Sequence, residues 1–200
     1  MRRGRPARTR THPPADKHAD VSLTGLARRV IELCDHLNLN RIDLVANDTG
    51  GAMAQIVAAH LGDRLLTLTL TNCDTEGNTP PLIFKPVTVA ARLGLIIKIG
   101  PHVATRRPLM QRVLGIGYQH PRRLPREIVD AYIEPVLGTA VAARALSRII
   151  TALSSTDLAA VRPHLSQLTA PTLIVTCSRF PGRLVLGVHA AVFVVVWCLS

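Results

Sequence analysis

The carboxylate of Asp48 lies where the sequence predicts the sharpest turn of the chain, within the run Asn47-Asp48-Thr49-Gly50-Gly51. The mostly apolar residues 42–46 before it are typical of a strand, and a helix-like stretch begins at Ala52. A strand, a tight glycine turn and a helix in this order present the side chain at the turn for nucleophilic attack. We therefore predict that Asp48 is a nucleophile.

Small residues around Asp48 agree with this prediction. The turn forces the backbones of the strand and the helix together, so the positions two residues before and after the nucleophile must be small. They are Ala46 and Gly50, and Gly51 lets the helix lie close to the strand. The positive end of the helix favours the ionised form of Asp48.

Three other roles fit the same residues less well. Asp48 is suited to cap the helix, a role that does not exclude catalysis. The tripeptide Asp48-Thr49-Gly50 occurs in aspartic proteases, but in an all-β fold, whereas an alanine-rich helix follows here. A phosphate site at the helix N-terminus would need the three-glycine fingerprint or the P-loop lysine, and the run has neither.

Hydrophobic periodicity predicts the elements that position Asp48. In chain order they are a helix capped by Asp20 or Ser22 and reaching Leu37, a strand at 41–46, a helix at 52–61, a strand at 65–71, a helix at 157–168 and a strand at 172–176. The first strand is apolar enough to be buried on both faces. Strand, helix and strand within about thirty residues form a βαβ unit, which implies a parallel sheet and an α/β fold.

The segment between the second and third strands changes character. Prolines punctuate short helical stretches there, and no strand is evident. We therefore expect a helical insertion in the α/β core. The predicted organisation is a basic disordered tail at 1–20, a core unit at 21–78, the insertion at 79–155, a core helix and strand at 156–177, and an apolar tail at 178–200.

The amino-acid composition limits which binding partners and which cellular compartment we expect. The chain has 24 Lys and Arg against 13 Asp and Glu, a formal charge of +11. No nucleic-acid motif accompanies this charge, so we expect solvated surfaces and no nucleic-acid partner. The four scattered cysteines are typical of free thiols in a reducing compartment, and no apolar signal segment follows the basic start. We expect a cytoplasmic protein without a metal or other cofactor.

The run at 184–199 is almost wholly apolar. As a helix its sixteen residues would rise about 24 Å, short of the roughly 30 Å hydrocarbon core of a membrane. A buried strand or helix, or a sticky tail, is favoured over membrane contact. Phe193 to Trp197 has high β-propensity and no charge.

Three stretches together resemble the α/β-hydrolase superfamily, in particular its aspartate-nucleophile branch of epoxide hydrolases and haloalkane dehalogenases. They are Leu44-Val45-Ala46-Asn47-Asp48-Thr49-Gly50-Gly51, Leu70-Thr71-Asn72-Cys73-Asp74 and Thr169-Ala170-Pro171-Thr172-Leu173-Ile174-Val175. The resemblance covers about residues 20 to 176. It implies a partial α/β-hydrolase fold in which the helical insertion is the cap over a substrate pocket.

The resemblance also implies a two-step hydrolysis of a small apolar electrophile. Asp48 would attack a carbon bearing an epoxide oxygen or a halide and form an ester, with the Thr49 backbone N–H as an oxyanion donor. Tyr118 and Tyr132 of the insertion would protonate the epoxide oxygen. Dehalogenases usually have Trp where this chain has Thr49, which favours epoxides.

The second step needs an acid and a histidine, and here the sequence departs from the family. No Asp or Glu follows Asp157, which leaves Asp74, after the second strand, as the substitute acid. His164 and His189 do not have the position of the family's histidine. We therefore expect an impaired hydrolase, truncated at both ends relative to the family. The alternative is a non-catalytic fragment or a basic interaction protein.

Overall fold

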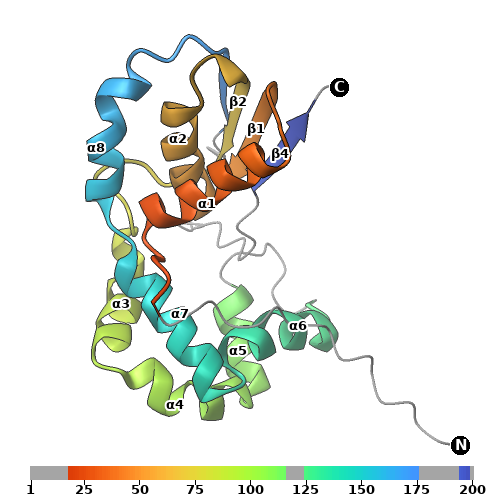
Figure 1. Ribbon diagram of the computed structural model, residues 1–200. Helices are drawn as coiled ribbons and strands as arrows, with labels where there is room; N and C mark the ends of the chain where they lie inside the picture. Colours follow the sequence, from red (N-terminus) through yellow and green to blue (C-terminus); the bar gives the residue numbers. More distant parts are fainter. Residues whose placement is uncertain (1–17, 116–123, 176–193, 199–200) are drawn as a thin grey trace, which may run out of the picture.

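A computed structural model describes residues 18–115, 124–175 and 194–198 of the chain. The α/β class, the parallel sheet and the helical insertion predicted from the sequence are all confirmed. Figure 1 shows the sheet with its helices, and below it the group of helices formed by the insertion. Of the predicted tails at 1–20 and 178–200, residues 1–17, 178–193 and 199–200 lie outside the described residues.

The core begins with helix α1 and alternates between strands and helices. Of the two caps predicted for α1, Asp20 and Ser22, the structure has Ser22, which accepts a hydrogen bond from the Gly25 N–H at 3.0 Å. The core elements are α1 (Leu23–His36), β1 (Ile42–Asn47), α2 (Thr49–Leu61), the 3₁₀ turn η1 (Gly62–Arg64), β2 (Leu65–Thr71), α8 (Ser155–Leu165), β3 (Thr172–Val175) and β4 (Val194–Cys198).

The sheet has the strand order β3-β2-β1-β4. Strands β1, β2 and β3 run parallel, as the βαβ pattern predicts, and β4 pairs antiparallel with β1. Strand β4 comes from the apolar run for which the sequence left a strand, a helix or a tail open. It completes the hydrogen bonding of β1 on the side away from β2.

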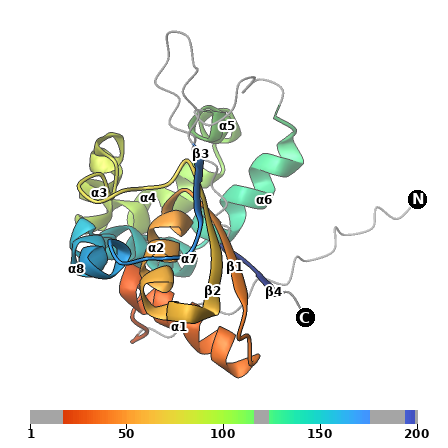
Figure 2. The ribbon, with the colours of Figure 1, turned by 90° about the horizontal axis from the view of Figure 1, so that it is seen from above.

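Helices α1, α2 and α8 lie on the same side of the sheet (Figure 2). Ile42, Leu44 and Ala46 of β1 are buried in one core with α2, α1 and α8. The opposite face of β1 is more open: Val45 is 38% exposed, and Asp43 accepts a hydrogen bond from the Thr67 hydroxyl of β2. The prediction that β1 is buried on both faces is therefore wrong, because the core helices that the structure describes cover one face and leave Val45 partly exposed.

The regular elements of the insertion, in its described residues, are all helices. They are η2 (Leu82–Phe84), α3 (Lys85–Arg92), α4 (Leu95–Ala104), α5 (Arg107–Gly115), α6 (Arg126–Leu137) and α7 (Ala140–Ala152). Met110, Leu114, Val129 and Ile133 form a second, smaller core between α5 and α6. This core is separate from the one beneath the sheet, so the insertion has apolar packing of its own.

Within the described ranges no single helix is long and apolar enough to cross a membrane. Helices α3 and α4 meet that criterion only as a pair, and they are bent by 112° with respect to each other.

Candidate functional site

Asp48 lies at the carboxyl end of β1, between the strand and α2. Its backbone has φ 55° and ψ −134°, a conformation that residues other than glycine rarely adopt and that costs on the order of 1–3 kcal/mol. The Asp48 N–H donates to the Thr71 carbonyl, and the Asp48 carbonyl accepts from the Gly51 N–H at 2.9 Å. Asp48 makes no side-chain capping hydrogen bond to α2. Helix capping therefore does not explain the carboxylate at this strained turn.

The close approach predicted for Gly51 involves a residue that the sequence did not single out, Cys73. A Cβ atom added at Gly51 would lie 1.8 Å from the Cys73 sulfur. The start of α2 thus packs directly against the loop that follows β2. Burial raises the pKa of the Cys73 thiol to about 11, so at neutral pH this thiol packs as a neutral group.

Asp74 reaches the same place from the end of β2. Its side chain is only 5% exposed, and its Oδ2 accepts a hydrogen bond from the Thr49 hydroxyl at 3.1 Å. The Asp74 N–H donates to the Asp48 carbonyl. Among the predicted residues, the structure thus brings Asp48, Thr49 and Asp74 together. This position, at the carboxyl ends of parallel strands, is where open α/β sheets bind ligands.

Gln55 links the start of α2 to the loop that follows β2. Its side-chain amide donates to the Asp74 carbonyl at 3.0 Å and to the Gly51 carbonyl at 3.1 Å. Sequence reasoning missed this residue, although a signal was present: Gln55 is a polar residue in an otherwise apolar part of α2, two turns after Asp48.

Burial raises the pKa of the Asp74 carboxyl above its usual range, and the Thr49 hydrogen bond offsets only part of this effect. The folded protein therefore holds this proton to a higher pH than the unfolded chain does. Consequently Asp74 lowers the free energy of unfolding as pH rises from the ordinary carboxyl value, about 4, through the raised folded value.

We expect Asp74→Asn to remove this loss, so that the variant gains stability relative to the parent chain as pH rises. Urea unfolding between about pH 4 and pH 7 measures the difference. Glu76→Gln is the matched control, because the Arg162 guanidinium beside Glu76 lowers the pKa of that carboxyl and gives a shift of opposite sign. Parallel profiles for the parent and Asp74→Asn would contradict the assigned direction.

Thr49 is the first residue of α2. Its N–H is therefore one of the four at the helix start without an acceptor inside the helix. The backbone role predicted for it remains a prediction. The hydrogen bond from its hydroxyl to Asp74 is an additional feature that only the fold reveals.

His164 is not brought to Asp48. It lies exposed on α8, and its ring stacks on that of His60 with centroids 6.3 Å apart. His60 is twelve residues beyond Asp48, near the far end of α2, which corresponds to about 18 Å along a helix. His189 lies outside the described residues.

Of the two candidate tyrosines, the structure describes only Tyr132. Tyr132, on α6, is half-buried against the core of Met110, Leu114, Val129 and Ile133. Tyr118 lies outside the described residues. Among the side chains that the structure describes, no three His, Cys, Asp or Glu are grouped so as to hold a metal ion.

Comparison with known proteins assigns no family to the chain: no protein-family model matches it, and no curated protein matches it significantly. The structure alone establishes an α/β fold with three parallel strands. The chain is thus an α/β protein with a carboxylate at a strained turn between β1 and α2.

Proposed function

We propose that this chain forms an aspartyl ester with a small apolar epoxide or alkyl halide through Asp48, as its resemblance to aspartate-nucleophile α/β-hydrolases implies. The observation that carries the proposal is the backbone of Asp48, which has a positive φ at the carboxyl end of a parallel strand. Backbone strain of this kind persists only where the surrounding structure holds the residue in place, and such residues are concentrated at active sites.

In the proposed reaction a carboxylate oxygen of Asp48 forms a bond to the electrophilic carbon. The carbon–oxygen bond of the epoxide breaks, and the alkoxide takes a proton from solvent; with an alkyl halide the carbon–halogen bond breaks and halide leaves. The Thr49 N–H stabilises the ester carbonyl when water attacks it. Asp74 is a positioning residue, since it accepts the hydrogen bond from the Thr49 hydroxyl.

The second step needs a base that activates water. His164, the candidate on α8, stacks with His60 away from Asp48. The proposal therefore includes slow hydrolysis, so that the ester accumulates. The favoured substrates are epoxides, because the residue after the nucleophile is Thr49 and not the halide-binding Trp of dehalogenases.

Intact-protein mass spectrometry after incubation with 1,2-epoxyhexane tests the proposal. We expect one added epoxide per chain, released by hydroxylamine as esters are, and mapped to Asp48 by peptide sequencing. Asp48→Asn should lower the rate of labelling by at least about 10³-fold, since it removes the nucleophile. Asp63→Asn changes an exposed carboxylate after α2 and serves as the matched control.

Equal labelling of the parent chain and Asp48→Asn would overturn the proposal. A parent chain that folds cooperatively but acquires no ester would instead favour the second candidate, a non-catalytic α/β protein. The observation behind this second candidate is the placement of His60 and His164 away from the turn at Asp48.

A further inference from the structure

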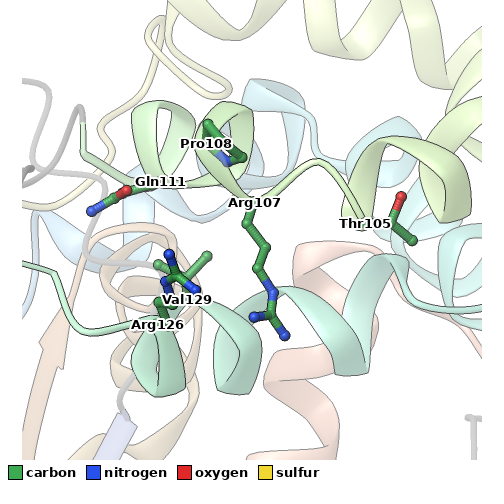
Figure 3. A pocket seen from close by; sticks show the side chains of 6 residues that line it. All are labelled: Thr105, Arg107, Pro108, Gln111, Arg126 and Val129. Atoms are coloured by element: carbon green, nitrogen blue, oxygen red, sulfur yellow. The ribbon is translucent and has the colours of Figure 1, made fainter.

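A cavity of about 330 Å³ opens at the surface of the helical insertion, between the end of α4 and helices α5 and α6. Six residues line it: Thr105, Arg107, Pro108, Gln111, Arg126 and Val129 (Figure 3). None of them belongs to the site at Asp48. The volume is in the range of pockets that hold small organic ligands.

Among the described residues, one positive charge of the lining has no ion-pair partner. The Arg107 guanidinium extends from α5 toward α6 (Figure 3) and pairs with Asp130 at 2.8 Å. Arg126 forms no ion pair with any residue that the structure describes. It is also the first residue of α6, where the helix dipole adds positive potential. A single negative charge would therefore balance the cavity.

The residues that surround the cavity in the sequence add to its positive charge. Residues 77–126 hold no Asp or Glu, and Arg106 and Arg112 flank the cavity residues of α5. The nearest acidic residues of α6 are Asp130, which already pairs with Arg107, and Glu127. A region with this excess of positive charge attracts anions before contact is made.

The rest of the lining offers apolar surface and few free hydrogen-bond donors, so it does not suit a fully hydrated anion. Val129 is buried in the insertion core, and Pro108 adds a second apolar surface. The Thr105 hydroxyl already donates to the His102 carbonyl, and the Gln111 amide donates to the Leu124 carbonyl. The guanidinium of Arg126 is therefore the main donor left for a ligand, beside an apolar wall.

We propose that this cavity binds a small organic monocarboxylate, with its carboxylate on Arg126 and its hydrocarbon part against Val129 and Pro108. Guanidinium and carboxylate match in geometry and form two parallel hydrogen bonds. This site is separate from Asp48, so its test does not depend on the proposed ester chemistry.

The test is a titration of the ¹⁵N-labelled full chain with hexanoate, followed by amide chemical shifts. We expect saturable shifts at Gln111, Arg126 and Val129. Hexanamide, which lacks the charge, should bind at least about tenfold more weakly, as should inorganic phosphate, which lacks the hydrocarbon part. Equal binding of hexanamide would overturn the role of the charge, and equal binding of phosphate would overturn the monocarboxylate assignment.

Substitutions separate the site from the general charge of the chain. Arg126→Gln should weaken hexanoate binding at least about tenfold, and Arg126→Lys should have a smaller effect because it keeps the charge. Arg92→Gln, on exposed α3, removes the same charge outside the cavity and is the matched control. An equal loss in Arg92→Gln and Arg126→Gln, or the absence of saturable shifts in the parent chain, would overturn the proposal.

Discussion

Gly51→Ala is expected to lower the free energy of unfolding by about 3 kcal/mol, the upper end of the usual effect of overpacking a core. The new Cβ would lie 1.8 Å from the Cys73 sulfur and 2.4 Å from the Cys73 Cβ. The sulfur can rotate away, but the Cβ is fixed by the backbone, so α2 and the loop after β2 must separate. The same movement would displace Asp48 and Asp74, and we expect ester formation to be lost as well.

A double-mutant cycle with Cys73→Gly tests the cause of this loss. Removing both side-chain atoms of Cys73 leaves its Cα, at 3.4 Å, as the nearest atom to the new Cβ. We expect the double variant to be more stable than the sum of the single effects predicts, by at least about 1 kcal/mol. Additive effects would show that the contact with Cys73 is not the cause.

Gly77→Ala provides a second control. Gly77 has φ 81° and open space where a Cβ would be added. Alanine there introduces backbone strain without a clash and should cost only about 1 kcal/mol. Urea unfolding followed by far-UV circular dichroism measures all four variants.

Leu44→Ala is expected to cost about 3 kcal/mol, in the middle of the range for emptying a buried leucine site. Leu44 is fully buried between β1 and the helices that cover the sheet. The neighbouring residue of the same strand, Val45, points to the more open face. Val45→Ala should therefore cost no more than about 1 kcal/mol, although it also removes carbon atoms from an apolar side chain.

Comparing the losses of unfolding free energy in Leu44→Ala and Val45→Ala shows which face of the sheet is buried in solution. Strand propensity changes in both variants, so the difference between them reports the burial of the two faces. A large cost for both would mean that the face of Val45 is also covered. Two small costs would mean that β1 does not pack as the structure describes.

Local sequence determined the elements around Asp48 and their order. Small residues at 46, 50 and 51 permit a tight turn, Ser22 caps α1, and the apolar runs at 42–46 and 65–71 form β1 and β2 in the structure. These features depend on residues close together in the chain, so patterns of spacing reveal them. The parallel pairing followed as well, because a helix between two short strands leaves little other choice.

The packing of distant elements determines which side chains meet at the turn. Thr49 and Asp74 are twenty-five residues apart, and their hydrogen bond depends on the pairing of β1 with β2. Gln55 joins the same loops because α2 packs on the sheet.

Burial was likewise decided by the fold. Val45 is as apolar as its neighbour Leu44, yet it is partly exposed because the core helices lie on the other face of the sheet. The cavity at Arg126 joins residues of α5 and α6, and in the part of the chain that the structure describes Asp130 pairs with Arg107 and not with Arg126. Spacing along a chain reports local conformation, whereas these contacts depend on how separate elements pack.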